Sequence, residues 1–476
     1  MKRYVGITIF IILFISIVSI FAIFIARGYN FTGNEITENG IINVESTPED
    51  AKIYINGEEK GTSPKKIELV SGKYEIRLSK EGYIDWKKEI EIEPSIVTDI
   101  KLTLFPEELN LEQLTFTEID KVFFSTDGSQ AIYFVSQKPN KGIWLNKLEK
   151  SIFEISSPQA QKIAEFDSFP QECFANNNYE LEISNDNKKS ILTCKTENCN
   201  NFFIIDLENA DSKVTNLNNQ IGFNPENINF SFNNANFLIK DEEIIANYNI
   251  SNKQLTLISR KNNDYLPSIT PINESFLLIE KSYDNKGYTL QKITSDLQKT
   301  KIDLPEDINF DKSSEVYSSI NNSDLFVLST TQGAYIININ KIDSFKQFSQ
   351  SPINTIQWSN DGESFLFKEK ENLFSAIIKT DIEDNIRINL YTIIENYDSS
   401  TTTISWTTNS QHLITYNIDN KNLNITDSDG LNQRLLFDSE LAYPDAFKLS
   451  ENETFLLLLI QDDNNYSNLY SIKLKI

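Results

Sequence analysis

A short sequence pattern recurs from residue 120 to the end of the chain. It consists of an apolar residue, Ser or Thr, any residue, Asp or Asn, two polar residues and then an apolar strand. Eight copies occur, with the hydroxyl residue at Ser125, Ser184, Ser231, Thr270, Ser319, Ser359, Thr407 and Ser450. Their mean spacing is about 46 residues, close to the roughly 40 to 50 residues of a four-stranded propeller blade. The repeat therefore predicts a β-propeller over 107–476, and we favour eight blades over seven.

The Asp or Asn of each copy has a structural explanation. Its short side chain can accept hydrogen bonds from the backbone of a tight turn and so hold the hairpin between the first two strands of a blade. The clearest copies contribute Ser125, Asp127, Gly128, Ser184, Asp186, Ser359, Asp361 and Gly362. A calcium or substrate role for Asp127, Asp186 and Asp361 is the alternative. We disfavour it because these residues fall on separate blades, whereas Ca²⁺ needs several converging oxygen ligands.

The two ends of the repeat region predict how the propeller closes. The last copy has about three recognisable strands before Ile476, one fewer than a blade needs. We expect residues 110–116 (NLEQLTF) to supply the missing outer strand. Closure of this kind protects sheet edges that otherwise recruit other chains, which matters for a strand as apolar as 455–460.

The N-terminal region predicts a membrane anchor. Segment 5–26 holds about 22 residues without a charge, enough for a helix to cross a hydrocarbon core of roughly 30 Å. A cleaved signal peptide is the alternative, and its apolar stretch is shorter, roughly 7 to 15 residues. Lys2 and Arg3 precede the segment, so we expect residues 1–4 in the cytoplasm, a linker at 27–39 and the bulk of the chain outside, as a single-pass membrane protein.

Residues 41–104 alternate short β-rich runs with turn residues. In the run KYEIRLS, Tyr74, Ile76 and Leu78 fall on one face, which is typical of a half-buried strand. The pair Asn56-Gly57 indicates a tight hairpin. Further turn positions are Gly61, Pro64, Gly72 and Gly82. The pattern predicts a small all-β module.

These residues resemble the PEGA domain family. The family reads Pro-Glu-Gly-Ala where this chain has Pro48, Glu49, Asp50 and Ala51, and the strings G-T-S-P, S-G-K-Y-E-I-R-L and E-G-Y-I-D-W follow in order. The resemblance implies a small β-sandwich over 40–106, common in bacterial envelope proteins, without catalytic residues. Asp tolerates left-handed backbone better than most residues, so Asp50 can replace the glycine. Tyr83 and Trp86 are candidates for a binding patch, but we favour packing in the core.

The repeat region resembles TolB-like and WD-repeat-like propellers, in which S-x-D-G marks each blade. The complete string appears twice, at 125–128 and 359–362. The expected fold is therefore all-β apart from one N-terminal transmembrane helix, with a PEGA sandwich followed by a propeller.

The charge of the chain excludes several classes of function. Asp and Glu number 68 against 44 Lys and Arg, a formal charge of -24, so we expect no nucleic-acid partner. One His and three Cys leave too few residues for zinc sites or His-assisted nucleophiles. We therefore assign no catalytic, cofactor-binding or metal-binding residue. Simple solvation of a large surface explains the acidity better than a dedicated cation site.

The cysteines and the histidine have plain interpretations. Cys194 and Cys199 are spaced for a small disulfide-closed turn outside the cytoplasm, which leaves Cys173 odd, and three unpaired thiols are the alternative. His412 falls in the polar turn of the seventh copy, so we expect an exposed residue rather than a general base.

These features together predict a non-enzymatic, membrane-anchored envelope protein. Its working surface would be a propeller face that binds a protein or a cell-wall ligand, because recognition usually resides in loops on a rigid scaffold. A propeller-type hydrolase or lyase acting on an extracellular polymer is the alternative, since the fold alone does not decide function.

Overall fold

The computed structural model of the 476-residue chain divides into two compact units. The first comprises Met1–Asn110 with Lys473–Ile476, and the second comprises Leu111–Ile472. The residues that the structure describes are 12–19, 29–32, 35–94, 96–147, 160–196, 199–209, 214–231, 236–262, 267–272, 275–281, 287–308, 310–319, 324–380, 385–450, 453–462 and 466–474.

Part of the predicted membrane segment 5–26 is described. Residues 12–19 are helical, and the remainder of the segment, like the predicted tail 1–4, lies outside the described residues. Within the described ranges, no helix has the length and apolar character needed to cross a membrane.

The segment 27–39, predicted as a linker, contains strand structure instead. Strand β1 (Tyr29–Thr32) pairs antiparallel with the start of β2 (Glu35–Thr47). Backbone hydrogen bonds rather than an apolar pattern define this pairing. The start of β2 therefore cannot be located from hydropathy.

The first unit is built from two sheets around one core. One sheet has the order β1-β2-β5, with β8 pairing in parallel with β2, and the other has the order β4-β3-β6-β7. The remaining bounds are β3 (Lys52–Ile55), β4 (Glu58–Thr62), β5 (Lys65–Val70), β6 (Gly72–Ser79), β7 (Trp86–Ile92) and β8 (Val97–Thr103). Ile42 of one sheet and Ile53 of the other are fully buried in the same cluster. This arrangement is a β-sandwich.

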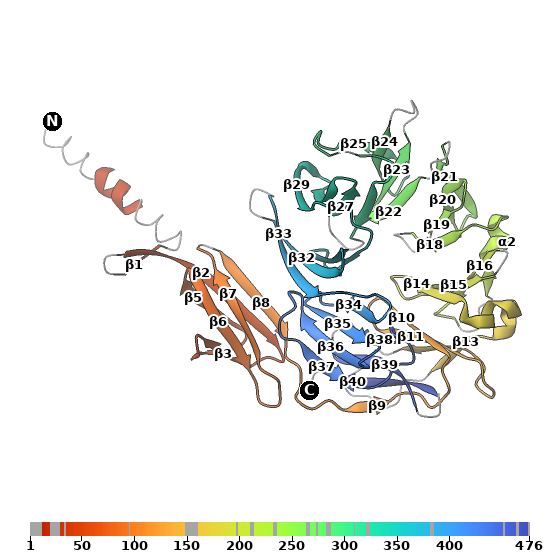
Figure 1. The fold of residues 1–476 in the computed structure, drawn as a ribbon, viewed down its shortest axis with the longest axis horizontal. Helices are drawn as coiled ribbons and strands as arrows, with labels where there is room; N and C mark the ends of the chain where they lie inside the picture. Colours follow the sequence, from red (N-terminus) through yellow and green to blue (C-terminus); the bar gives the residue numbers. More distant parts are fainter. Residues whose placement is uncertain are drawn as a thin grey trace. The chain divides into compact units, whose positions relative to one another are not determined.

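In the described residues, the second unit consists of eight four-stranded antiparallel sheets. We call them sheets 1 to 8 in chain order, and Figure 1 shows them following one another around a centre. Sheets 1 to 4 contain β10 (Lys121–Phe124), β11 (Gln130–Val135), β12 (Gly142–Lys147) and β13 (Gln161–Ala164); β14 (Tyr179–Ile183), β15 (Lys189–Lys195), β16 (Asn200–Asp206) and β17 (Thr215–Asn216); β18 (Asn227–Phe230), β19 (Asn236–Lys240), β20 (Ile244–Asn249) and β21 (Gln254–Arg260); β22 (Ser268–Ile272), β23 (Ser275–Lys281), β24 (Tyr288–Ile293) and β25 (Lys299–Ile302).

Sheets 5 to 8 repeat the same plan. They contain β26 (Glu315–Ser318), β27 (Leu325–Thr330), β28 (Gly333–Asn338) and β29 (Lys341–Ser349); β30 (Ile356–Trp358), β31 (Ser364–Glu369), β32 (Asn372–Thr380) and β33 (Ile386–Ile394); β34 (Thr402–Trp406), β35 (His412–Asn417), β36 (Asn422–Asp427) and β37 (Arg434–Phe437); β38 (Phe447–Leu449), β39 (Phe455–Gln461), β40 (Ser467–Lys473) and β9 (Leu111–Gln113). Short helices η1 (Phe166–Ser168), η2 (Gln171–Asn177) and α2 (Leu217–Ile221) lie in the connections. The architecture is that of a propeller.

Packing between neighbouring sheets explains the strand sequences. Every residue of β11 and of β27 is buried, because a second strand is covered on both faces. Leu145 of sheet 1 and Leu192 of sheet 2 belong to the same buried cluster. The apolar core of the unit therefore lies between adjacent sheets.

Strand β9 completes sheet 8 from the other end of the unit. It pairs antiparallel with β40, so that Gln113 lies opposite Tyr470 and Leu111 opposite Ile472. The prediction that residues 110–116 supply the missing outer strand is confirmed.

Candidate functional site

The repeated motif forms a closed turn between the first two strands of a sheet. In sheet 1 the backbone N–H of Ser125 donates to the carbonyl of Gln130 at 2.9 Å, and the N–H of Gln130 donates back to the Ser125 hydroxyl at 2.9 Å. That hydroxyl donates to Asp127 Oδ1 at 2.5 Å, which also accepts the backbone N–H of Ser129 at 3.0 Å. Asp127 therefore fixes the turn from inside.

The same bonds recur in other sheets. The hydroxyl of Ser184 donates to Asp186 Oδ1 at 2.6 Å, and that of Ser359 donates to Asp361 Oδ1 at 2.6 Å. Thr407 donates in the same way to the side chain of Asn409 at 2.8 Å. The hydrogen bonds explain the pairing of Ser or Thr with Asp or Asn two residues later in these copies. The fourth copy differs, because Thr270 lies inside β22 and is followed two residues later by Ile272.

One position of this turn requires left-handed backbone. Gly128 and Gly362 have φ values of 69° and 71° there, and Asn187, Ser410 and Glu453 fill the same position with φ values of 58°, 62° and 51°. Glycine adopts this conformation at little cost, and a larger residue adopts it only when its surroundings impose it. Copies of the motif that lack the glycine therefore keep the same left-handed turn position.

The electrostatics of Asp127 follow from these contacts. Its partial burial disfavours the charged form, but hydrogen bonds from Ser125, Ser129 and Asn187 outweigh this effect. The pKa of the Asp127 carboxyl consequently lies below its usual value. The carboxylate is engaged by its own turn and by the adjacent one.

The turns of neighbouring sheets contact one another. Asn187 of sheet 2 donates to Asp127 Oδ2 at 2.6 Å, and the backbone N–H of Asp361 in sheet 6 donates to the Ser410 hydroxyl of sheet 7 at 3.0 Å. The Thr408 hydroxyl of sheet 7 donates to the carbonyl of Ser450 in sheet 8 at 3.1 Å. We call the turns of sheets 1, 2, 6, 7 and 8 the turn ring.

Sheets 8 and 1 also approach each other closely at the turn that contains Gly128. A Cβ atom added to Gly128 would lie 2.2 Å from the carbonyl oxygen of Leu449. Only a glycine fits this approach without movement of the backbone.

Side chains of some first strands also form hydrogen bonds with the backbone of the first strand in an adjacent sheet. Lys121 of β10 donates to the carbonyl of Tyr179 in β14 at 3.1 Å, and Trp406 of β34 donates to the carbonyl of Gln357 in β30 at 3.0 Å. Glu182 of β14 accepts from the backbone N–H of Phe230 in β18 at 3.4 Å. These bonds satisfy backbone groups that the first strand of a sheet leaves unpaired.

Burial shifts two charged groups near these edges. It raises the pKa of the Glu182 carboxyl, although hydrogen bonds from Asn229 and the Phe230 N–H act in the opposite direction. It lowers the pKa of the Lys448 ammonium, which the nearby charge of Asp127 partly offsets. Both side chains belong to first strands, and each shift has desolvation as its leading cause.

The motif carboxylates are distributed rather than gathered. Asp127, Asp186 and Asp361 each accept hydrogen bonds within their own turns. Among the described residues no group of three or more His, Cys, Asp or Glu side chains is placed to hold a metal ion. The geometry assigns these residues to the shape of the turn ring.

The two signature loops of the first unit are held together. The backbone N–H of Asp50 donates to the carbonyl of Ser63 at 2.9 Å, and the N–H of Ala51 donates to its hydroxyl at 3.1 Å. Asp50 has a φ of 62°, as its place in a glycine position requires. The hairpin at Asn56 and Gly57 likewise has positive φ values, 48° and 83°.

Comparison with protein families agrees with this geometry. Residues 39–108 match the family model described as "PEGA domain". Residues 39–108 are a PEGA domain. A search of curated proteins gave no significant match to the chain.

Solved structures similar to the chain are propellers of several kinds. The Cps50 (Swd1) β-propeller domain of Myceliophteria thermophila is 11% identical with a TM-score of 0.38, covering 77% of this chain and 100% of that one. The WD40 domain of SCAP from fission yeast is 8% identical, TM-score 0.45, covering 77% and 94%. An oligogalacturonate lyase from Vibrio parahaemolyticus is 10% identical, TM-score 0.39, covering 77% and 96%. Similarities at this level assign no activity to the chain.

Tyr83 and Trp86 of the PEGA domain are core residues. Each is 6% exposed and belongs to the cluster that fills the sandwich. They do not form a surface patch, which agrees with the favoured interpretation.

His412 is buried, contrary to the prediction of an exposed residue. It is the first residue of β35 and is 3% exposed, with Nε2 3.7 Å from Asp427 Oδ1 of β36. The polar turn ends one residue earlier than the sequence suggests. Because second strands are covered on both faces, His412 falls inside the packed sheet.

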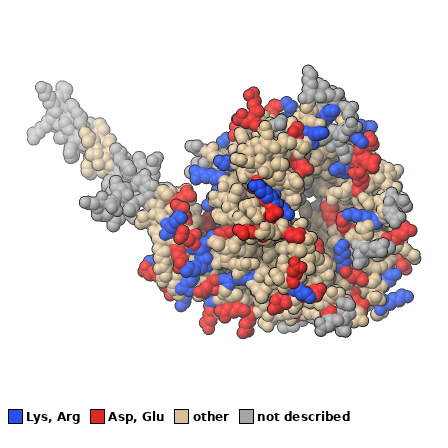
Figure 2. Space-filling model, viewed as in Figure 1, with Lys and Arg blue, Asp and Glu red and all other residues tan. Residues whose placement is uncertain are grey.

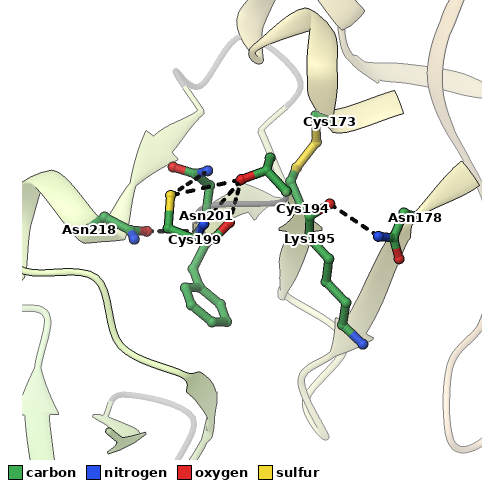
Figure 3. The surroundings of a disulfide bond; sticks show 9 residues. Cys173, Asn178, Cys194, Lys195, Cys199, Asn201 and Asn218 are labelled. Atoms are coloured by element: carbon green, nitrogen blue, oxygen red, sulfur yellow. Dashed lines mark hydrogen bonds between the residues drawn. A yellow bond between two sulfur atoms is a disulfide. The ribbon is translucent and has the colours of Figure 1, made fainter. Parts of the chain in front are cut away.

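The predicted disulfide between Cys194 and Cys199 is replaced by another. Cys194 of β15 is bonded to Cys173 of η2, and Cys199 carries no disulfide (Figure 3). Cys173 and Cys194 lie 0% and 1% exposed in the core between sheets 1 and 2. Cys199 is held elsewhere, since the Thr196 hydroxyl donates to its carbonyl at 2.6 Å. Nearness in sequence therefore did not indicate the partner.

Proposed function

We propose that the chain is a non-enzymatic binding protein, anchored in a membrane and exposed outside the cytoplasm, in which sheets 1 to 8 are the eight blades of one propeller. The observation that carries the proposal is the turn ring. Its motif side chains are engaged in holding the turns and one another, as the bond between Asn187 and Asp127 illustrates. A scaffold whose turns are held in this way can display loops for recognition.

Two features support a place outside the cytoplasm. The disulfide between Cys173 and Cys194 is of a kind that persists in oxidising compartments. The uncharged segment 5–26 has the length of a membrane helix, with Lys2 and Arg3 before it. We therefore propose residues 1–4 in the cytoplasm and the PEGA domain and propeller outside.

The charge of the exposed part favours a protein or cell-wall partner over nucleic acid. Because Lys2, Arg3 and Arg27 are the only charged residues before Glu35, the total of -24 leaves -27 for the remainder. On the face shown in Figure 2, acidic and basic side chains are interspersed rather than gathered into one large patch. We infer that the acidity chiefly solvates the surface and that a propeller loop face carries recognition.

A topology and redox experiment tests the compartment. The full chain with a tag after Ile476 is expressed in intact cells, which are treated with external protease, and in a parallel sample free thiols are alkylated in denaturant without reductant. We expect the tag to be cleaved in intact cells and one of the three thiols to be alkylated. Protection of the tag until lysis, or alkylation of all three thiols, would contradict the proposal.

An activity screen tests the non-enzymatic part. The purified full chain is incubated with extracellular polysaccharides and peptides, and products are followed by mass spectrometry. We expect no turnover above a heat-denatured control. Turnover that is lost in a Glu182→Gln variant would instead support a hydrolase or lyase using the buried carboxyl.

A further inference from the structure

A small cavity lies against sheet 1, where the segment that follows β9 passes over it. Its volume is about 260 Å³. Tyr133, Trp144 and Asn146 line it from the sheet, and Thr115, Phe116 and Thr117 line it from the segment after β9. We call it the Asn146 pocket. It lies at the junction where the two ends of the propeller meet.

Asn146 is the unusual residue of this pocket. It is 1% exposed, and neither its side-chain oxygen nor its side-chain nitrogen has a hydrogen-bond partner among the described residues. Burial of an unpaired amide costs free energy, so such groups are rare in stable folds. A ligand that offers both a donor and an acceptor would satisfy the amide.

The repeat shows that this position does not otherwise need a polar amide. Asn146 of β12 lies opposite Ala131 of β11. Ala131 is the second residue of its strand, so the equivalent residue in another sheet is the one opposite the second residue of the second strand. In sheets 2 to 7 this residue is Ile205, Tyr248, Ile293, Ile337, Ala376 and Thr426. All six are buried, and four are aliphatic residues at 0 to 2% exposure. An apolar residue therefore suits the fold at this position, and Asn146 departs from the pattern.

The neighbours of Asn146 present aromatic and hydroxyl groups to the same space. Tyr133 lies opposite Trp144 in the register of β11 and β12, two residues away from the pair that contains Asn146, so the three side chains share one face. Burial raises the pKa of Tyr133 to about 12, so its hydroxyl stays protonated near neutral pH. The Thr117 hydroxyl oxygen is buried without a hydrogen-bond partner in the described part of the chain.

The lining of the pocket therefore offers few polar groups, and these lie among apolar side chains. A sugar ring carries several hydroxyls, and each would need a partner when buried. The backbone N–H and C=O of one extended residue need one acceptor and one donor, which the amide of Asn146 supplies together. Phe116, whose exposed fraction is 83%, offers an apolar contact at the segment after β9. This combination favours a peptide with an apolar side chain.

We propose that the Asn146 pocket is a peptide-binding site that takes the backbone N–H and C=O of one residue, together with that residue's apolar side chain, from a partner polypeptide. Asn146 accepts a hydrogen bond from the N–H of that residue and donates one to its C=O, while Trp144 and Tyr133 contact the apolar side chain. The site is distinct from the turn ring and does not depend on the compartment of the protein.

Binding of capped amino acids by the full chain tests the proposal. The probes are N-acetyl-leucine N-methylamide, the ester analogue in which oxygen replaces the leucine N–H, and N-acetylglucosamine, each followed by ligand-observed NMR. We expect the leucine amide to bind and the ester to bind at least about tenfold more weakly. No binding of the amide at millimolar concentration, or binding of the sugar in its place, would overturn the proposal.

Variants separate recognition from folding. Asn146→Leu introduces the residue type that the repeat prefers, so we expect an equal or higher melting temperature with at least about tenfold weaker binding. Thr426→Val, at the same register position in sheet 7, is the matched control and should bind as the parent does. Thr117→Val serves as a second test if Asn146→Leu fails to fold, with weaker binding expected. Unchanged binding in a folded Asn146→Leu variant, or in Thr117→Val where it replaces that test, refutes the site.

Discussion

The hydroxyl of Tyr443 is bonded to both backbone groups of Val122, although 321 residues separate them in the chain. It donates to the Val122 carbonyl at 2.7 Å and accepts the Val122 N–H at 2.8 Å. Val122 lies on β10, the first strand of sheet 1, and Tyr443 lies in the segment before β38, the first strand of sheet 8. One side chain thus joins the first and last sheets.

Removal of this hydroxyl should destabilise the propeller. Tyr443→Phe leaves two backbone groups of Val122 unpaired, which costs about 1–3 kcal/mol of unfolding free energy. Denaturant unfolding of the full chain measures the change. Tyr466→Phe, at a residue 46% exposed, is the control and should change stability by less than about 0.5 kcal/mol. Equal effects of the two variants would show that the contact does not stabilise closure.

Reduction of the disulfide should also destabilise the second unit. Cys173 and Cys194 close a loop with a sequence separation of 21 residues, for which chain-entropy arguments give about 3 kcal/mol. The melting temperature should fall in the double variant Cys173→Ala and Cys194→Ala, and Cys199→Ser should leave it unchanged. Peptide mapping without reductant checks the pairing directly, and a peptide linking Cys194 to Cys199 would contradict the structure.

A methyl group at Gly128 should cost more than the loss of backbone freedom alone. Gly128 and Gly222 both have positive φ, 69° and 85°, but a Cβ at Gly222 meets nothing within 4 Å. Gly222→Ala should therefore cost about 1 kcal/mol, and Gly128→Ala clearly more because of Leu449. Thermal unfolding of both variants gives the comparison. Similar losses would mean that sheets 8 and 1 adjust easily.

The stability that Asp127 contributes should fall as the pH is lowered in the acidic range. Its pKa is lowered in the folded state, so its contribution is fully present above the ordinary carboxyl pKa of about 3.9 and is lost as pH falls through the folded value. Asp127→Asn should therefore lose less stability than the parent between pH 5 and pH 3. Parallel unfolding curves at the two pH values provide the measurement. Identical pH dependence would contradict a depressed pKa.

Periodic features of this protein could be predicted from its sequence. The motif at Ser125 and Asp127 located the turn of sheet 1, and the three-strand final repeat pointed to residues 110–116, which contain the completing strand β9. These features are local or repeat many times, so each copy supports the others. The Asn-Gly hairpin and the glycine position filled by Asp50 were likewise set by local backbone preferences.

Features that depend on packing between sheets could not be predicted in this way. Cys173 meets Cys194 because η2 packs into the core between sheets 1 and 2, and no spacing rule describes that contact. His412 follows a polar turn in sequence, yet both faces of its strand are covered. Asn146 was overlooked although a signal existed: alignment of the third strands places it where the other described repeats carry buried, mostly apolar residues.

Sheet 8 also sets an order of events during synthesis. Strand β9 emerges early, but its partner β40 is made more than 350 residues later, as the bond between Thr115 and Asn468 across 353 positions indicates. A chain that stops before β40 retains an unpaired early strand and an incomplete last sheet. The eighth sheet can therefore close only after the strands of sheets 1 to 7 have been synthesised, because all of them lie between β9 and β40 in the chain.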